Sequence, residues 1–379
     1  MAENTPATVS PGQLATADQY NTIVGFFNNY GVASYASDPA TPNEGQIWFN
    51  STQGRVKASV VAPVITHKTN FTAPTGHNKV HALAYDGTYI YAGYNTSPGV
   101  VDQIIPSTMA LNKTFTAPTG HNTVHALAYD GTYIYAGYST IPGIVDQIVP
   151  STMALSKTFT APTGHNKVHA LAYDGTYIYA AYGAGEVVDQ IIPSMMILNK
   201  TSATLQGNCA SLAYDGTYIY AGLSTSPGVV QQIIPSTLAI GITFNMISDY
   251  ANAIAFLNGR LYAGSGLNQY GPAVVECFDV ASGASICLGQ TNGNLGHIYA
   301  VIPIHDFVFV GGMANIIIAY DPTTLSILAY RGPNDILGNF GSILSFAFDG
   351  TYLYTGLSQS PGIVGQLEIA TKQMTRNVA

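Results

Sequence analysis

Six of the nine histidines form three identical pairs with a spacing of four residues: His77/His81, His121/His125 and His165/His169. Imidazole is a common ligand of transition metals, so these pairs raise the question of a metal site. On an extended strand, residues four apart share a face but lie roughly 13 Å apart, too far to bind one ion. A metal would need histidines from different repeats. The simpler interpretation is a repeated loop hydrogen bond by His77, His121 and His165 within their own repeats. We therefore expect no metal and no cofactor.

Carboxyl side chains recur as well. Five aspartates precede glycine, a pair typical of tight turns: Asp86, Asp130, Asp174, Asp215 and Asp349. A second set lies in apolar segments and is expected to accept hydrogen bonds from backbone donors: Asp102, Asp146 and Asp189, with Gln232 in this place in the fourth repeat. Glycosidases need two carboxyl groups facing each other across a cleft, and no such pair is marked here. The sequence therefore predicts that the protein is not an enzyme.

Aromatic and amide side chains meet in two loops of each repeat, where a tyrosine is expected beside an asparagine. Aromatic faces cover the apolar side of a sugar and amides bind its hydroxyl groups, so these loops are candidates for glycan binding. The alternative is that the tyrosines pack between neighbouring repeats. The candidate residues are His77, Asn78, Tyr94, His121, Asn122, Tyr138, His165, Asn166 and Tyr182.

The element that must position these residues is an internal repeat. The phrase ALAYDGTYIYAG returns seven times in exact or degraded form, at intervals of 41 to 47 residues. Its anchoring aromatic residues are Tyr91, Tyr135, Tyr179, Tyr220, Tyr262, Phe309 and Tyr354. This period, with apolar strands separated by turn residues, is typical of four-stranded propeller blades. We predict an all-β, seven-bladed β-propeller of four-stranded antiparallel blades over residues 61–379. In such a ring the strands that carry His81, His125 and His169 converge on the central channel.

Two alternatives concern this architecture. A solenoid also consists of repeats, but it needs polar capping repeats, and none is evident. Two segments could supply the last outer strand of a ring. Ile65–Asn78 matches the end of a repeat, and Met374–Val378 in the C-terminal tail does so too. The sequence leaves open which of them closes the ring.

Residues 1–60 differ from the repeats. Thr16–Gln19 matches a capping box that opens a short helix, followed by two short strands at 46–50 and 55–60 that form a β-hairpin. Neither piece is large enough to fold alone, so this segment is expected to dock on the propeller or on another subunit. Its expected anchor residues are the apolar helix face and the only tryptophan: Tyr20, Ile23, Val24, Phe27 and Trp48.

The composition narrows the function classes. Only 8% of residues are charged, against roughly 25% in ordinary soluble domains, and the formal net charge is −8. Nucleic acid is an unsuitable partner, because phosphates need clustered lysine and arginine. No membrane partner is expected, since no apolar run reaches spanning length, and the N-terminus lacks the pattern of a signal peptide. Cys277 and Cys287 flank a turn and are either a cross-strand disulfide or two free thiols.

Three resemblances add to this interpretation. From Val80 onward the DGTYIYAG strand pairs resemble the YVTN-type branch of β-propellers, which implies the fold. The Gly-His dipeptide resembles the start of WD-type repeats, although the closing Trp-Asp is absent. It stands at Gly76-His77, Gly120-His121, Gly164-His165 and Gly296-His297. The N-terminal pieces Thr16–Asn21 and Asp38–Lys57 are similar to a pattern in tailed-phage structural proteins, which implies an attachment module of a fibre, tail or decoration protein.

These observations together predict a non-enzymatic virion structural protein, found in a virion or outside cells. Residues 1–60 would anchor it to other virion or assembly subunits, and the propeller would face host surfaces or glycans, with a homo-oligomer expected. One alternative is a secreted or surface-layer glycan-binding propeller of a prokaryote. A second alternative is a propeller lyase or hydrolase.

Overall fold

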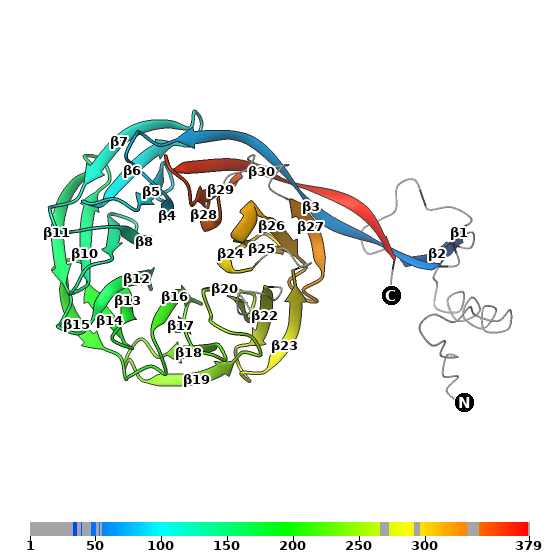
Figure 1. The fold of residues 1–379 in the computed structure, drawn as a ribbon. Coiled ribbons are helices and arrows are strands. Elements are labelled where there is room, and N and C mark those ends of the chain that lie inside the picture. The colour runs from blue at the N-terminus through cyan, green and yellow to red at the C-terminus, as the bar shows by residue number, and fades with distance from the viewer. Residues whose placement is uncertain are drawn as a thin grey trace. The chain divides into compact units, whose positions relative to one another are not determined.

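The computed structural model describes residues 33–35, 39, 47–50, 53, 55–265, 273–291, 296–331 and 341–377. The chain divides into two compact units, one of residues 65–369 and one of residues 1–64 with 370–379. In the first unit, seven antiparallel four-stranded arrays lie around a common centre (Figure 1). The sequence prediction of a seven-bladed, all-β propeller is therefore confirmed. Among the described residues no helix has the length and apolar character needed to cross a membrane.

Each blade runs from an inner strand at the central channel to an outer strand at the circumference. The inner strands are β4 (Val80–Tyr85), β8 (Val124–Tyr129), β12 (Asn166–Tyr173), β16 (Cys209–Tyr214), β20 (Ala253–Leu257), β24 (Ile298–Ile304) and β28 (Ile343–Phe348). The second strands are β5 (Ile90–Tyr94), β9 (Ile134–Tyr138), β13 (Ile178–Ala184), β17 (Ile219–Leu223), β21 (Arg260–Ser265), β25 (Phe307–Gly312) and β29 (Tyr352–Leu357).

The third and outer strands complete the blades. The third strands are β6 (Val100–Ile105), β10 (Ile144–Val149), β14 (Val188–Ile192), β18 (Val229–Ile233), β22 (Val274–Asp279), β26 (Ile317–Tyr320) and β30 (Ile363–Asn377). The outer strands are β7 (Ala110–Thr116), β11 (Ala154–Thr160), β15 (Ile197–Thr201), β19 (Ile240–Asn245), β23 (Ser285–Gln290), β27 (Ile327–Arg331) and β3 (Arg55–Thr72). A short 3-10 helix, η1 (Met313–Asn315), follows β25.

Burial explains why the second strand is the most apolar part of each repeat. All five residues of β5 and of β9 are buried, because both faces of the blade pack against neighbouring blades. A small residue is required where these blades meet: a Cβ atom on Gly93 would lie 2.5 Å from Cγ1 of Val124 in the next blade. By contrast, β7 exposes all but one of its residues, and the buried one is Phe115. The repeated motif is thus the buried interior of the ring.

The N-terminal strand closes the ring. In sheet order, β3 pairs with β30, which pairs with β29 and then β28. Lys68 Nζ on β3 donates to Glu368 Oε2 on β30 at 3.2 Å. At the same junction Gln366 Nε2 donates to the carbonyl oxygen of Pro106 in the first blade at 2.9 Å. Of the two candidate segments, the one beginning at Ile65 supplies the outer strand. A closed ring also excludes the solenoid.

The same bridge joins the first four blades to one another. Gln103 donates to the carbonyl oxygen of Pro150 at 3.0 Å, just as Gln366 does to that of Pro106. The interface between the last and first blades therefore repeats an interface inside the repeat array.

The second unit contains the expected hairpin. β2 (Ile47–Asn50) pairs antiparallel with the start of β3, and Trp48 lies opposite Lys57. β1 (Ala33–Tyr35), which the sequence did not predict, pairs parallel with β2. The predicted helix, and with it Tyr20, Ile23, Val24 and Phe27, lies outside the described residues.

The two candidate disulfide cysteines are neighbours across two strands. Cys277 on β22 lies directly opposite Cys287 on β23, and both are free thiols in this structure. The expectation that they face each other on a hairpin is therefore confirmed, and of the two alternatives the structure has the free thiols.

Candidate functional site: the rim loops and the central channel

The loop histidines bind within their own blades, as expected. Nδ1 of His77 lies 2.8 Å from Oδ2 of Asp102, and Thr114 Oγ1 donates to Oδ1 of the same aspartate at 2.6 Å. The second and third blades repeat this arrangement with His121, Asp146 and Thr158, and with His165, Asp189 and Thr201. Each of these aspartates is fully buried. The three histidines therefore stabilise their blades and are already partnered.

Two sequence expectations about these aspartates were wrong. Their partners are the side chains of a histidine and a threonine instead of backbone donors, because the loop before each inner strand folds back over the third strand. In the fourth blade the equivalent residue is Gln231 and not Gln232. Gln231 lies opposite Ala221 just as Asp102 lies opposite Ala92. Residues one apart on a strand face opposite sides, so the register decides which of them takes the place of the aspartate.

The predicted rim tyrosines have no exposed face. Tyr94, Tyr138 and Tyr182 are all 0% exposed. The hydroxyl of Tyr182 donates to Oδ2 of Asp189 at 2.8 Å. Burial, together with the nearby aspartate, raises the pKa of all three hydroxyl groups. Of the two sequence interpretations, packing between blades describes these residues, and a sugar has no ring here on which to stack.

The rim asparagines are half-buried, and two of them join neighbouring blades. Ser97 Oγ donates to Oδ1 of Asn122 at 2.7 Å, and Ser360 Oγ donates to Oδ1 of Asn78. Asn166 begins β12 and lies opposite Ala184. The structure thus brings each rim histidine against the rim tyrosine of its blade, with ring centroids 5.2 to 5.4 Å apart, but in contacts that serve the fold.

The aspartates of the Asp-Gly turns have the local role expected of them. Oδ1 of Asp86 accepts from the backbone N–H groups of Thr88 and Tyr89, both at 2.7 Å, and Oδ2 accepts from the hydroxyl of Tyr91 at 2.6 Å. The same three contacts recur at the other four turns. These carboxyl groups hold their turns and the anchoring tyrosines in place.

A repeated irregularity at the start of the inner strands defines a different site. Between Val80 and Ala82 the pairing of β4 with β5 shifts by one residue, so His81 is bulged. Five other inner strands shift at the same point, and in the fifth blade Asn252 directly precedes β20. Bulges re-aim a side chain. The residues at this position, which we call the ring, are His81, His125, His169, Ala210, Asn252, Tyr299 and Leu344, and all of them except His169 line a cavity in the channel.

The three histidines of this ring lie on adjacent blades and contact one another. The rings of His81 and His125 meet edge to face with centroids 4.7 Å apart, and those of His125 and His169 stack at 5.2 Å. Burial, with a contribution from Lys79, lowers the pKa of His81 to about 4. Burial and the neighbouring histidines lower the pKa of His125 to about 3. These imidazoles are therefore neutral at pH 7.

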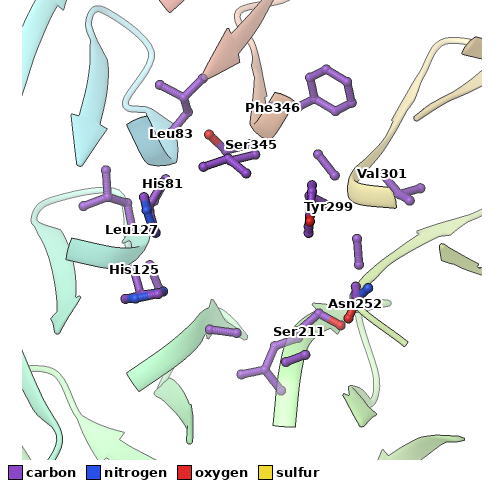
Figure 2. Close-up of a pocket in the computed structure, with 18 of the residues that line it drawn as sticks. His81, Leu83, His125, Leu127, Ser211, Asn252, Tyr299, Val301, Ser345 and Phe346 are labelled. Carbon is purple, nitrogen blue, oxygen red and sulfur yellow. The ribbon is translucent and has the colours of Figure 1, made fainter. Parts of the chain in front are cut away.

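The ring borders a cavity of about 240 Å³ in the channel (Figure 2). His81 and His125 lie on one side, and Tyr299 and Asn252 lie on the opposite side. Two positions further along each inner strand, the lining is entirely apolar: Leu83, Leu127, Leu171, Leu212, Ile254, Val301 and Phe346. The cavity thus combines four polar side chains of the ring, His81, His125, Asn252 and Tyr299, with a neighbouring layer of apolar side chains. Within the described part of the chain, no three His, Cys, Asp or Glu side chains are arranged to hold a metal ion.

Sequence reasoning identified the histidines of this ring as residues that converge, but it missed Asn252 and Tyr299. The signal was nonetheless present. Each ring residue stands ten positions before the anchoring aromatic residue of its repeat, as His81 stands before Tyr91 and Tyr299 before Phe309. What the sequence did not reveal was the bulge that turns this position toward the channel.

Comparison with known proteins yields no match: no protein-family model fits the chain, and no curated protein sequence matches it.

Proposed function

We propose that this protein is a non-catalytic structural component of a virion, a tail, fibre or capsid-decorating protein, in which residues 1–60 anchor the chain and the propeller contacts a host surface. The observation that carries the proposal is that the repeated aspartate and histidine side chains form hydrogen bonds within the propeller. The buried aspartates and the loop histidines bind each other, and the turn aspartates bind their own turns. Groups so engaged support the fold, which favours a binding protein over a lyase or hydrolase.

The anchor part of the proposal is supported by continuity of the backbone. β3 runs from Arg55 to Thr72, so the strand that pairs with β2 in the hairpin also supplies the last outer strand of the ring. A load on the attachment segment would therefore act directly on a strand that belongs to the propeller. The similarity of Thr16–Asn21 and Asp38–Lys57 to tailed-phage structural proteins favours a virion as the assembly.

The test is incorporation into particles. The full-length chain and a chain lacking residues 1–60 would each be produced with a tag during particle assembly, and purified particles would be analysed by quantitative mass spectrometry. The truncation leaves the closing strand from Ile65 intact, so the ring is retained, which thermal unfolding of the free protein checks. We expect the full-length chain in the particles and the truncated chain in the soluble fraction. Full-length protein absent from particles, or equal incorporation of the truncated chain, would refute the proposal.

A second candidate, a glycan-binding protein of a prokaryotic surface, is favoured by the channel cavity. In this cavity Tyr299 presents an aromatic ring and Asn252 presents an amide group, whereas the aromatic rings of the rim tyrosines are buried.

A further inference from the structure

The channel cavity is built asymmetrically from a symmetric fold. Ring positions in the first three blades are histidines, whereas the fifth and sixth blades supply Asn252 and Tyr299. Tyr299 is 36% exposed, unlike the tyrosines between the blades, and its ring stacks on that of His297 with centroids 5.9 Å apart. An aromatic ring with an exposed surface therefore lies across the channel from a set of imidazoles (Figure 2).

The hydrogen-bonding groups of this cavity are uncharged. Among the described residues that line it, none is Asp, Glu, Lys or Arg. A neutral imidazole has one donor and one acceptor nitrogen, an amide has both kinds of atom, and the Tyr299 hydroxyl adds another. Lys79 and Lys167 act on these imidazoles from outside the lining, so a charged ligand would lose its hydration without a counter-charge in contact with it, which is costly. The lining therefore favours a neutral ligand with many hydroxyl groups.

The size and layering narrow the ligand further. Cavities that enclose drug-sized molecules measure roughly 300–1,000 Å³, and this one of about 240 Å³ suits a single small unit. The polar residues of the ring lie beside an apolar layer of four leucines, Ile254, Val301 and Phe346. A pyranose has this same division, since its hydroxyl edge and its C–H face are different surfaces.

We propose that the central channel, between the His81–His125 side and the Tyr299–Asn252 side, binds one uncharged sugar residue at the end of a glycan. Tyr299 stacks on the C–H face of the sugar, and Asn252 and the imidazoles bind its hydroxyl groups. This inference deepens the proposed contact with a host surface and rests on it. It gives that contact a location in the channel instead of on the rim.

Saturation-transfer difference NMR tests the inference on the full-length chain. The probes are methyl glycosides of glucose, galactose, mannose, rhamnose, N-acetylglucosamine and N-acetylgalactosamine at millimolar concentration, with glucuronate and N-acetylneuraminate as charged comparators. We expect signals from at least one neutral glycoside and none from the charged sugars. Silence from all neutral glycosides, or stronger signals from a charged sugar, would overturn the proposal.

Variants assign the signals to the channel. Ala210→Phe fills the cavity from the fourth blade, and the sixth blade already has an aromatic residue, Tyr299, at the equivalent position. This change and Tyr299→Ala are each expected to reduce the signal about tenfold, whereas Tyr299→Phe retains the stacking ring and loses less. Leu111→Ala, on the exposed face of β7, is the matched control and leaves the signal unchanged. Signals that survive Ala210→Phe in a folded protein would place the binding elsewhere and refute the site.

A parallel titration with Zn²⁺ tests whether the histidines bind a metal ion instead of a sugar. Binding of Zn²⁺ with silence from every neutral glycoside would refute the sugar site. Particle incorporation does not enter this experiment, so a failure here leaves the anchoring proposal intact, and a failure of anchoring leaves sugar binding intact.

Discussion

The first three blades and the last four have the same backbone but differ in what fills one buried position on the third strand. In the first three the position is an aspartate bound by a loop histidine and a threonine. In the fourth, Gln231 accepts from the backbone N–H of Gln206, and in the fifth, Glu276 accepts from that of Ile247. In the last two the position is Ile318 and Gly365.

The difference shows that the Asp–His–Thr hydrogen bonds are one of several ways in which a blade of this ring fills the buried position. A buried polar side chain is tolerated only with partners, while an apolar residue needs none. The network is therefore not a requirement of the propeller. Its presence in three nearly identical blades agrees with the copying of a whole unit, residue by residue.

The largest effect is expected from a substitution in the seventh blade, whose outer strand β3 closes the ring. Phe71 on β3 and Phe115 on β7 are equivalent outer-strand residues, each 4% exposed. Replacing either by alanine opens a cavity and costs about 3–5 kcal/mol. Because Phe71 also holds the strand that closes the ring, we expect Phe71→Ala to lower the urea midpoint more than Phe115→Ala. Equal midpoints would mean that the closing strand is no weaker than an internal one.

A smaller effect is expected from substitutions at the buried third-strand position, compared between the second and fourth blades. Asp146→Ala leaves His121 and Thr158 without their shared partner, which had been held at 2.8 and 2.6 Å. We expect a loss of about 3 kcal/mol in the free energy of unfolding. Gln231→Ala in the fourth blade is the matched control. It removes an uncharged amide that accepts from the backbone N–H of Gln206 at 2.9 Å and has only a long, 3.5 Å contact with Thr243, so we expect a smaller loss, about 1 kcal/mol. Chemical denaturation measures both, and similar losses would show that the aspartate network adds nothing special.

The smallest effect concerns pH and the histidines of the first three blades. Burial holds the pKa of His81 at about 4 and of His125 at about 3, below their ordinary value of 6.5. The unfolded chain thus binds more protons below pH 6.5 than the folded chain does. The stability from the neutral imidazoles is complete above pH 6.5 and is lost as the pH falls toward 4 and then 3.

Substitution of one histidine isolates this contribution. We expect the unfolding free energy of the wild-type protein to fall more between pH 7 and pH 5 than that of His125→Gln, because the carboxyl groups titrate in both proteins alike. Denaturation at the two pH values measures the difference. Parallel losses in the two proteins would show that His125 is not held neutral by its burial in the channel.

Much of the fold was predictable because residues close together in the sequence of each repeat specify the structure of a blade. The Asp-Gly turns, the apolar second strand and the proline turns specify a blade from neighbouring residues alone, and the seven copies of the repeat give the number of blades. The hydrogen bonds of the loop histidines within their blades were predictable for the same reason. That the rim tyrosines are unavailable to a sugar was not predictable, because the burial of Tyr94, Tyr138 and Tyr182 depends on the adjacent blade.

The sequence by itself determined a ring of seven like sheets, since copies of one pattern must bury the same faces in the same way. Only the tertiary structure decided which terminal strand closes that ring, because two segments have similar patterns and the choice depends on pairing between residues some 300 positions apart. It also decided that ring positions such as His81 and Tyr299 face the channel, because a bulge is a mismatch between two strands, and one strand alone does not contain it.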